Sequence, residues 1–185
     1  MTSIYAVLAT GVTTFVATNI DDLVLLTLFF ARRVKPRRVV AGQYLGFSAI
    51  ILVSLLGAWA AFAIPHRWIR LLGVLPLALG IKELMLGHRD QVLEARVEGY
   101  GIASVALITL ANGADNVGVY VPLFVVSRAD IWLVIVTYMV LIAVWCLAAS
   151  LLGHHRLILS LVNRWGHRIM PFVFIALGAY VLVFK

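Results

Sequence analysis

Two neighbouring carboxylates, Asp21 and Asp22, lie in the middle of an apolar run that extends over residues 3–30 and carries no other charge. A third acid, Asp115, lies in the middle of a second apolar run, 101–126. A charged side chain at bilayer depth costs at least about 2.5–3.5 kcal/mol on insertion scales, so such residues face a bundle interior or a water-filled cavity. No basic residue lies at that depth to compensate them. The three acids therefore predict a site for cations or protons.

Amide side chains accompany the acids. Asn19, Asn112 and Asn116 are candidate neutral ligands or hydrogen-bond donors, and Thr18 is a weaker candidate. On a continuous helix, residues three or four positions apart share a face, which would place Asn19 beside Asp22 and Asn112 beside Asp115. Asparagine and glycine are poor helix formers, so Asn112-Gly113 also suggests an unwound turn with carbonyl groups open to an ion.

Carboxylate and amide oxygens suit hard divalent cations such as Mg²⁺, Ca²⁺ and Mn²⁺, and tolerate Cd²⁺ or Zn²⁺. Protons would replace the metal when the metal leaves, which makes metal/proton exchange a natural hypothesis. The alternative is a polar cluster that only joins the helices. That alternative explains the asparagines but not three acids without a basic partner.

The whole chain has the composition of an all-α integral membrane protein. Of its 185 residues 63% are hydrophobic and 12% are charged, and its mean hydropathy is +1.05. Soluble domains carry about 25% charged residues. Six apolar segments are long enough to cross a hydrocarbon core of about 30 Å as helices. The predicted spans are 3–30, 39–64, 68–86, 101–126, 131–152 and 169–184.

The basic residues between the spans predict the orientation. One side of the membrane receives 11 Lys and Arg residues and the other side 4. Cytoplasmic loops carry the excess of positive charge, so both termini are expected outside the plasma membrane and the loop 87–100 in the cytoplasm. Positive charge in these short segments sets topology, and the net charge of +7 therefore does not indicate nucleic-acid binding.

The two halves of the chain resemble each other. ATNIDDL (17–23) aligns without gaps to ANGADNV (111–117), which sets Asp21 on Asp115 and Asp22 on Asn116. Repeat one covers about 3–86 and repeat two about 101–184. Each contains three spans, an odd number, so the second repeat enters the membrane from the opposite side. This parity predicts two inverted three-helix repeats in one membrane domain, with a site near the midplane where the repeats meet.

Several other residues have two interpretations. Gln43 and Tyr44 either line an exit path or form a polar start and an aromatic belt of the second span, and Glu83 is either a residue of the cytoplasmic mouth or a partner of Lys82. The histidines 154, 155 and 167 are either a metal-collecting patch or solvated interface residues. The single cysteine, Cys146, excludes an intrachain disulfide and a dithiol relay. No Gly-x-Ser-x-Gly or His-Glu-x-x-His occurs, and an enzyme is not expected.

Four stretches together resemble the CadD-like cadmium-resistance transporters of the lysine-exporter (LysE) superfamily. They are ATNIDDLVLLTLFF (17–30), GQYLGF (42–47), LLGVLPLALGIKEL (71–84) and NGADNVGVYVPLF (112–124). The resemblance implies a plasma-membrane efflux protein for divalent heavy metals, with Asp21, Asp22 and Asp115 as its acidic site residues. Some relatives have a cysteine where this chain has Asn112. The site expected here has only oxygen ligands, so manganese and zinc are candidate substrates beside cadmium.

The resemblance implies no permanent cofactor. The expected partners are the metal ion, the lipid bilayer and, as an open alternative, further copies of the chain. The superfamily also contains exporters of cationic amino acids, which is a rival function. A purely structural membrane subunit is another, and in such a subunit neutralising Asp21 and Asp115 would be harmless.

Overall fold

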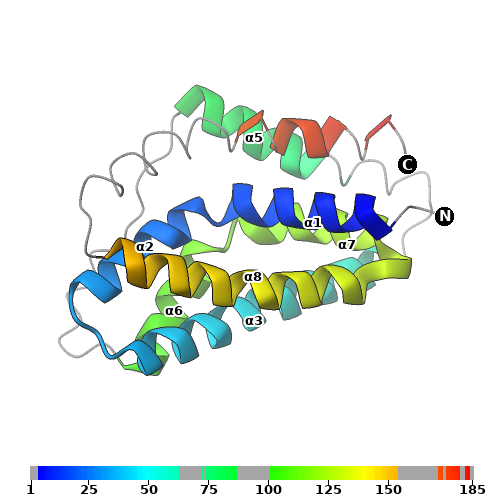
Figure 1. The fold of residues 1–185 in the computed structure, drawn as a ribbon. Coiled ribbons are helices and arrows are strands. Elements are labelled where there is room, and N and C mark those ends of the chain that lie inside the picture. Colours follow the sequence, from blue (N-terminus) through cyan, green and yellow to red (C-terminus); the bar gives the residue numbers. More distant parts are fainter. Residues whose placement is uncertain are drawn as a thin grey trace.

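The computed structural model describes residues 4–62, 72, 74–86, 101–153, 171–172, 174–179 and 182–183, and over these residues the chain is helical, with no β-strand (Figure 1). The predicted all-α class is confirmed for this part of the chain. The elements are α1 (Ile4–Thr18), α2 (Ile20–Ala31), α3 (Pro36–Phe62), α5 (Val74–Leu86), α6 (Ile102–Asn112), α7 (Asn116–Val126), the short 3-10 helix η2 (Arg128–Asp130) and α8 (Ile131–Leu152).

Two segments are long and apolar enough to cross a membrane without a break. They are Pro36–Ala61, with 26 residues, and Arg128–Leu152, with 25 residues. At 1.5 Å per residue, each exceeds a hydrocarbon core of about 30 Å. They correspond to the second and fifth predicted spans, 39–64 and 131–152.

Two further pairs of apolar helices are bent at a short break. The pair α1 and α2 is bent by 57°, and the pair α6 and α7 by 74°. If each bent pair counts as one span, the described residues contain up to four spans. The sequence predicted these segments, 3–30 and 101–126, as single spans, and the breaks lie at the two acidic motifs. The expectation of a continuous helix is therefore wrong at both motifs. Asn112 and Asp115 lie on either side of the second break, whereas Asn19 lies at the first break and directly precedes α2, which contains Asp22.

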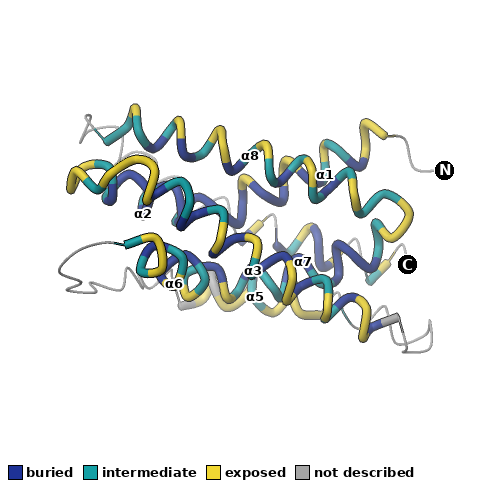
Figure 2. The backbone as a smooth tube through the Cα atoms, turned by 90° about the horizontal axis from the view of Figure 1, so that it is seen from below, coloured by how far each residue is buried: buried dark blue, intermediate teal, exposed yellow. Residues whose placement is uncertain are grey.

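Each long straight helix packs against a broken pair of the other half of the chain. α3 packs mainly against α6 and α7, and α8 mainly against α1 and α2 (Figures 1 and 2). The contact of α3 with α6 is close at Gly42 and Gly46. A Cβ atom at Gly42 would lie 2.8 Å from the Ile102 carbonyl oxygen, and one at Gly46 would lie 2.6 Å from that of Ala106. Small residues four positions apart let two membrane helices approach in this way.

The helix α5 packs against α7 and lies beside Pro171 and Ile175. A Cβ atom at Gly80 would lie 2.7 Å from the Pro171 carbonyl oxygen, and one at Gly118 would lie 2.9 Å from Leu79 Cδ1. The described part of α5 has 13 residues, and the third and sixth spans, 68–86 and 169–184, fall partly outside the described residues. Six spans and the inversion of the repeats therefore stay predictions.

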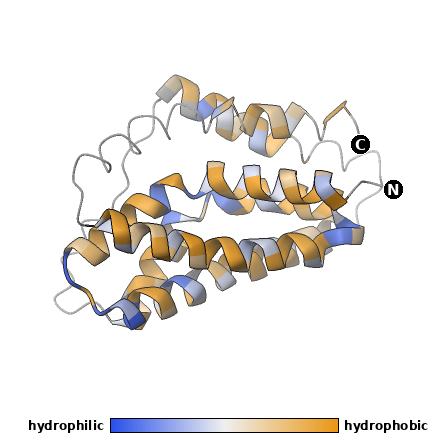
Figure 3. Ribbon diagram, in the orientation of Figure 1, coloured by the Kyte–Doolittle hydropathy of each residue, from blue (hydrophilic) through white to orange (hydrophobic). Residues whose placement is uncertain are grey.

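The outer face of α8 is apolar. Its exposed large side chains recur every three or four residues, as a single stripe formed by Trp132, Val136, Val140, Val144, Leu147 and Leu151. A helix on the surface of a soluble protein would place polar residues there. Hydrophilic residues gather instead at the turn between α2 and α3 and around η2 (Figure 3). Apolar flanks with polar ends are the pattern of a bundle surrounded by lipid.

Candidate functional site

The first acidic motif lies at the break between α1 and α2. The residue between the two helices, Asn19, is buried, and its carbonyl oxygen accepts a hydrogen bond of 2.7 Å from the indole N–H of Trp145 on α8. Its backbone N–H still donates to the Phe15 carbonyl at 3.0 Å. Neither glycine nor proline occurs at this break. The bend coincides instead with the hydrogen bond from Trp145 of α8, a helix in the other half of the chain.

The second acidic motif lies at the break between α6 and α7, which is a turn over residues 113–115. The Asn116 N–H donates to the Gly113 carbonyl at 3.2 Å, and the Gly118 N–H donates to the Asp115 carbonyl at 3.0 Å. These bonds reach back three residues instead of the four of an α-helix. The interruption that Asn112-Gly113 suggested is confirmed.

Asp21 connects the two breaks. Its Oδ2 accepts a hydrogen bond of 3.1 Å from the Asn112 amide, at the end of α6. Its Oδ1 accepts a bond of 2.8 Å from the backbone N–H of Asp22, one of the N–H groups in the first turn of α2 that have no partner within the helix. The two motifs that the repeat aligns are thus in direct contact.

Asp22 turns to a different neighbour. It is 4% exposed, and its Oδ2 accepts a hydrogen bond from the amide nitrogen of Gln43 on α3. The Gln43 Oε1 in turn accepts a bond of 2.7 Å from the Thr109 hydroxyl on α6. The other carboxylate oxygen, Asp22 Oδ1, is buried without a hydrogen-bond partner among the described residues. One carboxylate oxygen of Asp22 therefore accepts a hydrogen bond, and the other, although buried, accepts none among the described residues.

The side chains of Thr18, Asn19 and Tyr120 form a hydrogen-bonded cluster at the first break. The Asn19 amide nitrogen lies 2.8 Å from the Phe15 carbonyl, the Thr18 hydroxyl and the Tyr120 hydroxyl, and the two hydroxyls lie 2.8 Å apart. Thr18 also donates to the Thr14 carbonyl at 2.9 Å. These bonds tie the end of α1 to α7, a helix of the other half of the chain.

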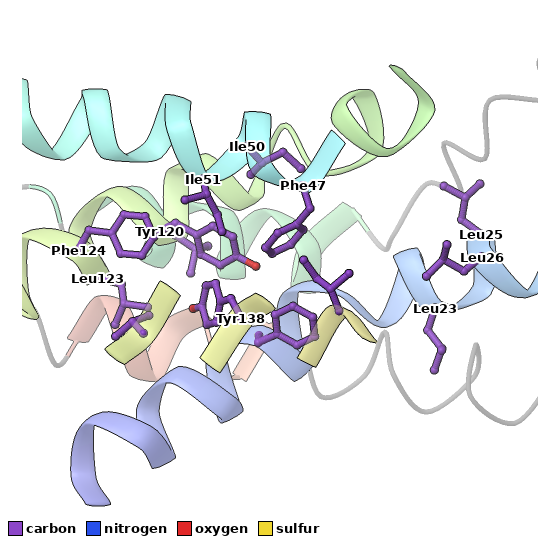
Figure 4. Close-up of a cluster of buried hydrophobic side chains, with 14 of the residues drawn as sticks. Leu23, Leu25, Leu26, Phe47, Ile50, Ile51, Tyr120, Leu123, Phe124 and Tyr138 are labelled. Carbon is purple, nitrogen blue, oxygen red and sulfur yellow. The ribbon is translucent and has the colours of Figure 1, made fainter. Parts of the chain in front are cut away.

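Aromatic side chains enclose this polar group. Phe15, Phe47, Tyr120 and Tyr138 come from α1, α3, α7 and α8, and each is at most 1% exposed. Five pairs of their rings have centroids 5.0–6.2 Å apart. Further along α2 lie Leu23, Leu25 and Leu26, on the opposite side of the close-up in Figure 4. Along the chain, Thr18 and Asn19 follow the buried Phe15 and precede the buried Leu23, so apolar core residues flank the first break on both sides.

Asp115 directly precedes α7 and Asn116 begins it. Asn116 is buried, and Asp115 is half-buried. Within the described residues, no group of three or more His, Cys, Asp or Glu side chains is arranged so that it could hold a metal ion. A shared role of the three acids in one site therefore stays a prediction.

Among the weaker candidates, Gln43 is buried at the site and not part of a polar surface. Tyr44 is half-buried, and its hydroxyl donates to the Met139 carbonyl at 3.0 Å, which joins α3 to α8. Glu83 lies on α5, and its side chain, like the three histidines 154, 155 and 167, lies outside the described residues. Cys146 is buried and forms no disulfide, as expected of a small apolar residue.

Sequence reasoning missed two residues, Thr109 and Tyr120. Thr109 lies three residues before Asn112, and Tyr120 lies four residues after Asn116. Extending the helical spacing outward from each asparagine would have found both positions. Isolated Thr and Tyr residues are common in apolar helices, so their residue types alone gave no signal.

A family model described as cadmium resistance transporter matches residues 15–185, which include both acidic motifs and all of the described helices except residues 4–14 of α1. The chain belongs to the cadmium resistance transporter family. No curated protein and no solved structure matches it. The resemblance drawn from the four motif stretches is thus confirmed at the level of the family. A cadmium resistance transporter is a membrane protein that moves a metal ion, and a transporter family agrees with the expectation that the chain is not an enzyme.

Proposed function

We propose that this cadmium resistance transporter exports a divalent metal cation, which binds near mid-membrane between the two broken helices. Asp22 carries the proposal: it is 4% exposed and its Oδ1 is buried without a hydrogen-bond partner among the described residues. All described Lys and Arg side chains are exposed, so none of them compensates this carboxylate from within the core. A buried carboxylate that is not compensated needs a cation or a proton.

Asp21, Asp22 and Asp115 would supply the charged ligands. Asn19, Asn112 and Asn116 would supply neutral oxygen ligands or hold the acids, with Thr18 in a lesser role. The contact of 3.1 Å between Asn112 and Asp21 supports a site shared by both halves of the chain.

Helix ends of both signs meet at the breaks. α1 and α6 end there, at Thr18 and Asn112. The carboxyl end of a helix carries about half an elementary negative charge on its unpaired carbonyl groups, which would attract a cation. Broken helices place such ends near coupling ions in transporters built from inverted repeats. The amino ends of α2 and α7 carry the opposite charge and would stabilise the ionised forms of Asp21, Asp22 and Asp115.

The proposed architecture has six spans in two inverted repeats, which alternate in opening the site to either side. The reciprocal packing of α3 on the second broken pair and of α8 on the first supports two related halves. The segment that joins α2 to α3 carries five basic residues, which are Arg32, Arg33, Lys35, Arg37 and Arg38. Under the positive-inside rule this segment is cytoplasmic, so both termini would lie outside the plasma membrane.

Release of the metal would leave a carboxylate that binds a proton, so the proposed cycle exchanges metal for protons. Cadmium is the substrate that the family suggests. The oxygen ligands proposed here also suit manganese and zinc. No permanent cofactor is needed for this cycle.

The rival function, export of cationic amino acids, fits less well. A zwitterion needs a basic partner for its own carboxylate, and the described Lys and Arg residues are all exposed.

Calorimetric titration of the purified protein with Cd²⁺, Zn²⁺, Mn²⁺ and Ca²⁺ tests the proposal. The wild type should bind at least one of the four metals, and Asp21→Asn, Asp22→Asn and Asp115→Asn should each weaken that binding. Asp130→Asn, at the start of α8, is the matched control and should bind as the wild type does. Absence of binding in the wild type, or unchanged binding in all three variants, would reject the proposed site.

A further inference from the structure

The hydroxyl of Thr109 has an unusual partner. Four other threonines in the helices, Thr10, Thr18, Thr27 and Thr137, donate to the carbonyl four residues earlier in their own helix. This is the usual bond of threonine in a membrane helix. Thr109, which is 2% exposed, instead donates across the interface to Gln43 Oε1 on α3 at 2.7 Å.

The chemistry of the three groups fixes how they are arranged. An ionised carboxylate only accepts hydrogen bonds, so Gln43 must turn its NH₂ group toward Asp22 Oδ2. The Gln43 carbonyl oxygen then faces Thr109, whose hydroxyl must donate. In this orientation the Gln43 oxygen faces Thr109 and the Gln43 NH₂ group faces Asp22, so Gln43 positions Asp22.

The two glycines beside Gln43 make this bridge possible. A Cβ atom at Gly46 would lie 2.7 Å from Thr109 Cβ, and one at Gly42 would lie 2.5 Å from Val105 Cβ. The absence of both side chains lets α6 approach α3 closely enough for Thr109 to reach Gln43. The bridge thus joins α6, in the second half of the chain, to α3 and α2 in the first half.

We propose that Thr109 and Gln43 together favour binding of a cation to Asp22 through a single oxygen, Oδ1, and thereby contribute to the metal selectivity of the site. Because Oδ2 accepts a hydrogen bond from Gln43, a metal that binds both oxygens of Asp22 must compete with this bond. Ca²⁺ takes six to eight oxygen ligands and often binds carboxylates through both oxygens, whereas Zn²⁺ takes four ligands at fixed positions. The bridge therefore favours Zn²⁺-like cations over Ca²⁺. This inference rests on the proposed function.

Calorimetric titration with Zn²⁺ and with Ca²⁺ gives the ratio of their two dissociation constants. Thr109→Val removes the hydroxyl at nearly constant volume and frees the Gln43 amide to turn. Gln43→Met removes the donor to Asp22 and keeps the length of the side chain. Each variant should lower the preference for Zn²⁺ over Ca²⁺ by about tenfold, the effect of one hydrogen bond to a charged group.

Two controls separate selectivity from folding. Thr109→Ser keeps the hydroxyl and should keep the wild-type ratio. Thr27→Val removes a buried hydroxyl that donates to the Leu23 carbonyl of its own helix, and it should also keep that ratio. Thermal unfolding of each variant records its stability beside its metal affinities.

The outcomes are distinct. If the wild type binds neither Zn²⁺ nor Ca²⁺ nor the other metals, the proposed function fails. If the wild type binds metal and both Thr109→Val and Gln43→Met keep its Zn²⁺/Ca²⁺ ratio, or weaken both metals alike, only the selectivity role is rejected. If neither variant can be purified in a folded form, the two residues serve folding and the selectivity role is rejected as well.

Discussion

The first broken helix bends by 57° at the single residue Asn19, whereas the second bends by 74° over the turn 113–115. At the first break, the hydrogen bonds of Asn19 with Trp145 and Tyr120 join it to helices of the other half of the chain. At the second break, Gly113 supplies the weak point and three-residue turns replace the helical bonds. The first break is therefore anchored by side chains, and the second by the backbone of its own turn.

The two breaks also differ in charge and packing. The first has two acids and the second has one, because Asn116 takes the place of Asp22 in the repeat. α6 of the second pair is packed against Gly42 and Gly46 of α3, whereas Gly11 of the first pair leaves ordinary distances to α8. Two related halves thus give an asymmetric centre. The first break carries most of the charge, and the second is held in place by the close contact of α6 with α3.

The largest effect is expected from Asp22. Asp22→Asn removes the negative charge of the carboxylate whose Oδ1 has no hydrogen-bond partner among the described residues. We expect this substitution to weaken metal binding by about 100-fold. Asp115→Asn, at the break with a single acid, should weaken metal binding by about tenfold. Calorimetric titration of both variants beside the wild type measures this order. Equal losses would mean that the site is symmetric.

The packing difference predicts a smaller effect. Gly46→Ala places a Cβ atom 2.6 Å from the Ala106 carbonyl oxygen, and we expect it to lower the free energy of unfolding by about 1–3 kcal/mol. Gly11→Ala is the matched control, because its Cβ would meet Tyr138 and Val134 only at 3.9 Å. Thermal unfolding in detergent compares the two. Similar destabilisation by both substitutions would show that the two interfaces are equally tight.

The smallest effect separates two buried tyrosines. Tyr120→Phe removes the hydroxyl that contacts Thr18 and Asn19 at the first break, and it should cost about 1 kcal/mol of unfolding free energy. The Tyr138 hydroxyl is buried without a hydrogen-bond partner among the described residues, so Tyr138→Phe should be neutral or stabilising. Unfolding by denaturant in the same detergent measures both. Equal losses would argue against the anchoring role of Tyr120.

The sequence drew attention to Asp21, Asp22 and Asp115 through their apolar surroundings, because charge in a spanning segment is rare and costly. Their shared role in one site stays a prediction, and the geometry around them was only partly predictable. The second break followed from Asn112-Gly113, whose residue types disfavour a helix. The first break did not follow, because no residue of Thr-Asn-Ile-Asp-Asp requires a bend and its anchors lie on α7 and α8.

The hydrogen bonds that connect Thr109 through Gln43 to Asp22 could not be predicted from the sequence either. They depend on how closely α3 and α6 approach, and this distance is set by Gly42 and Gly46 together with the residues they face. The spacing of Gln43 in its own helix carries no information on that distance. The second and fifth spans were predictable from length and hydropathy alone, and α3 and α8 match their predicted ranges to within a few residues.

Anomalous scattering from crystals of the wild-type protein grown with Cd²⁺ locates the metal itself. We predict a peak within about 2.5 Å of Asp22 Oδ1, between the two breaks, which is lost in crystals of Asp22→Asn. A peak only at another place in the chain, or one that persists unchanged in Asp22→Asn, would contradict the proposed role of Asp22.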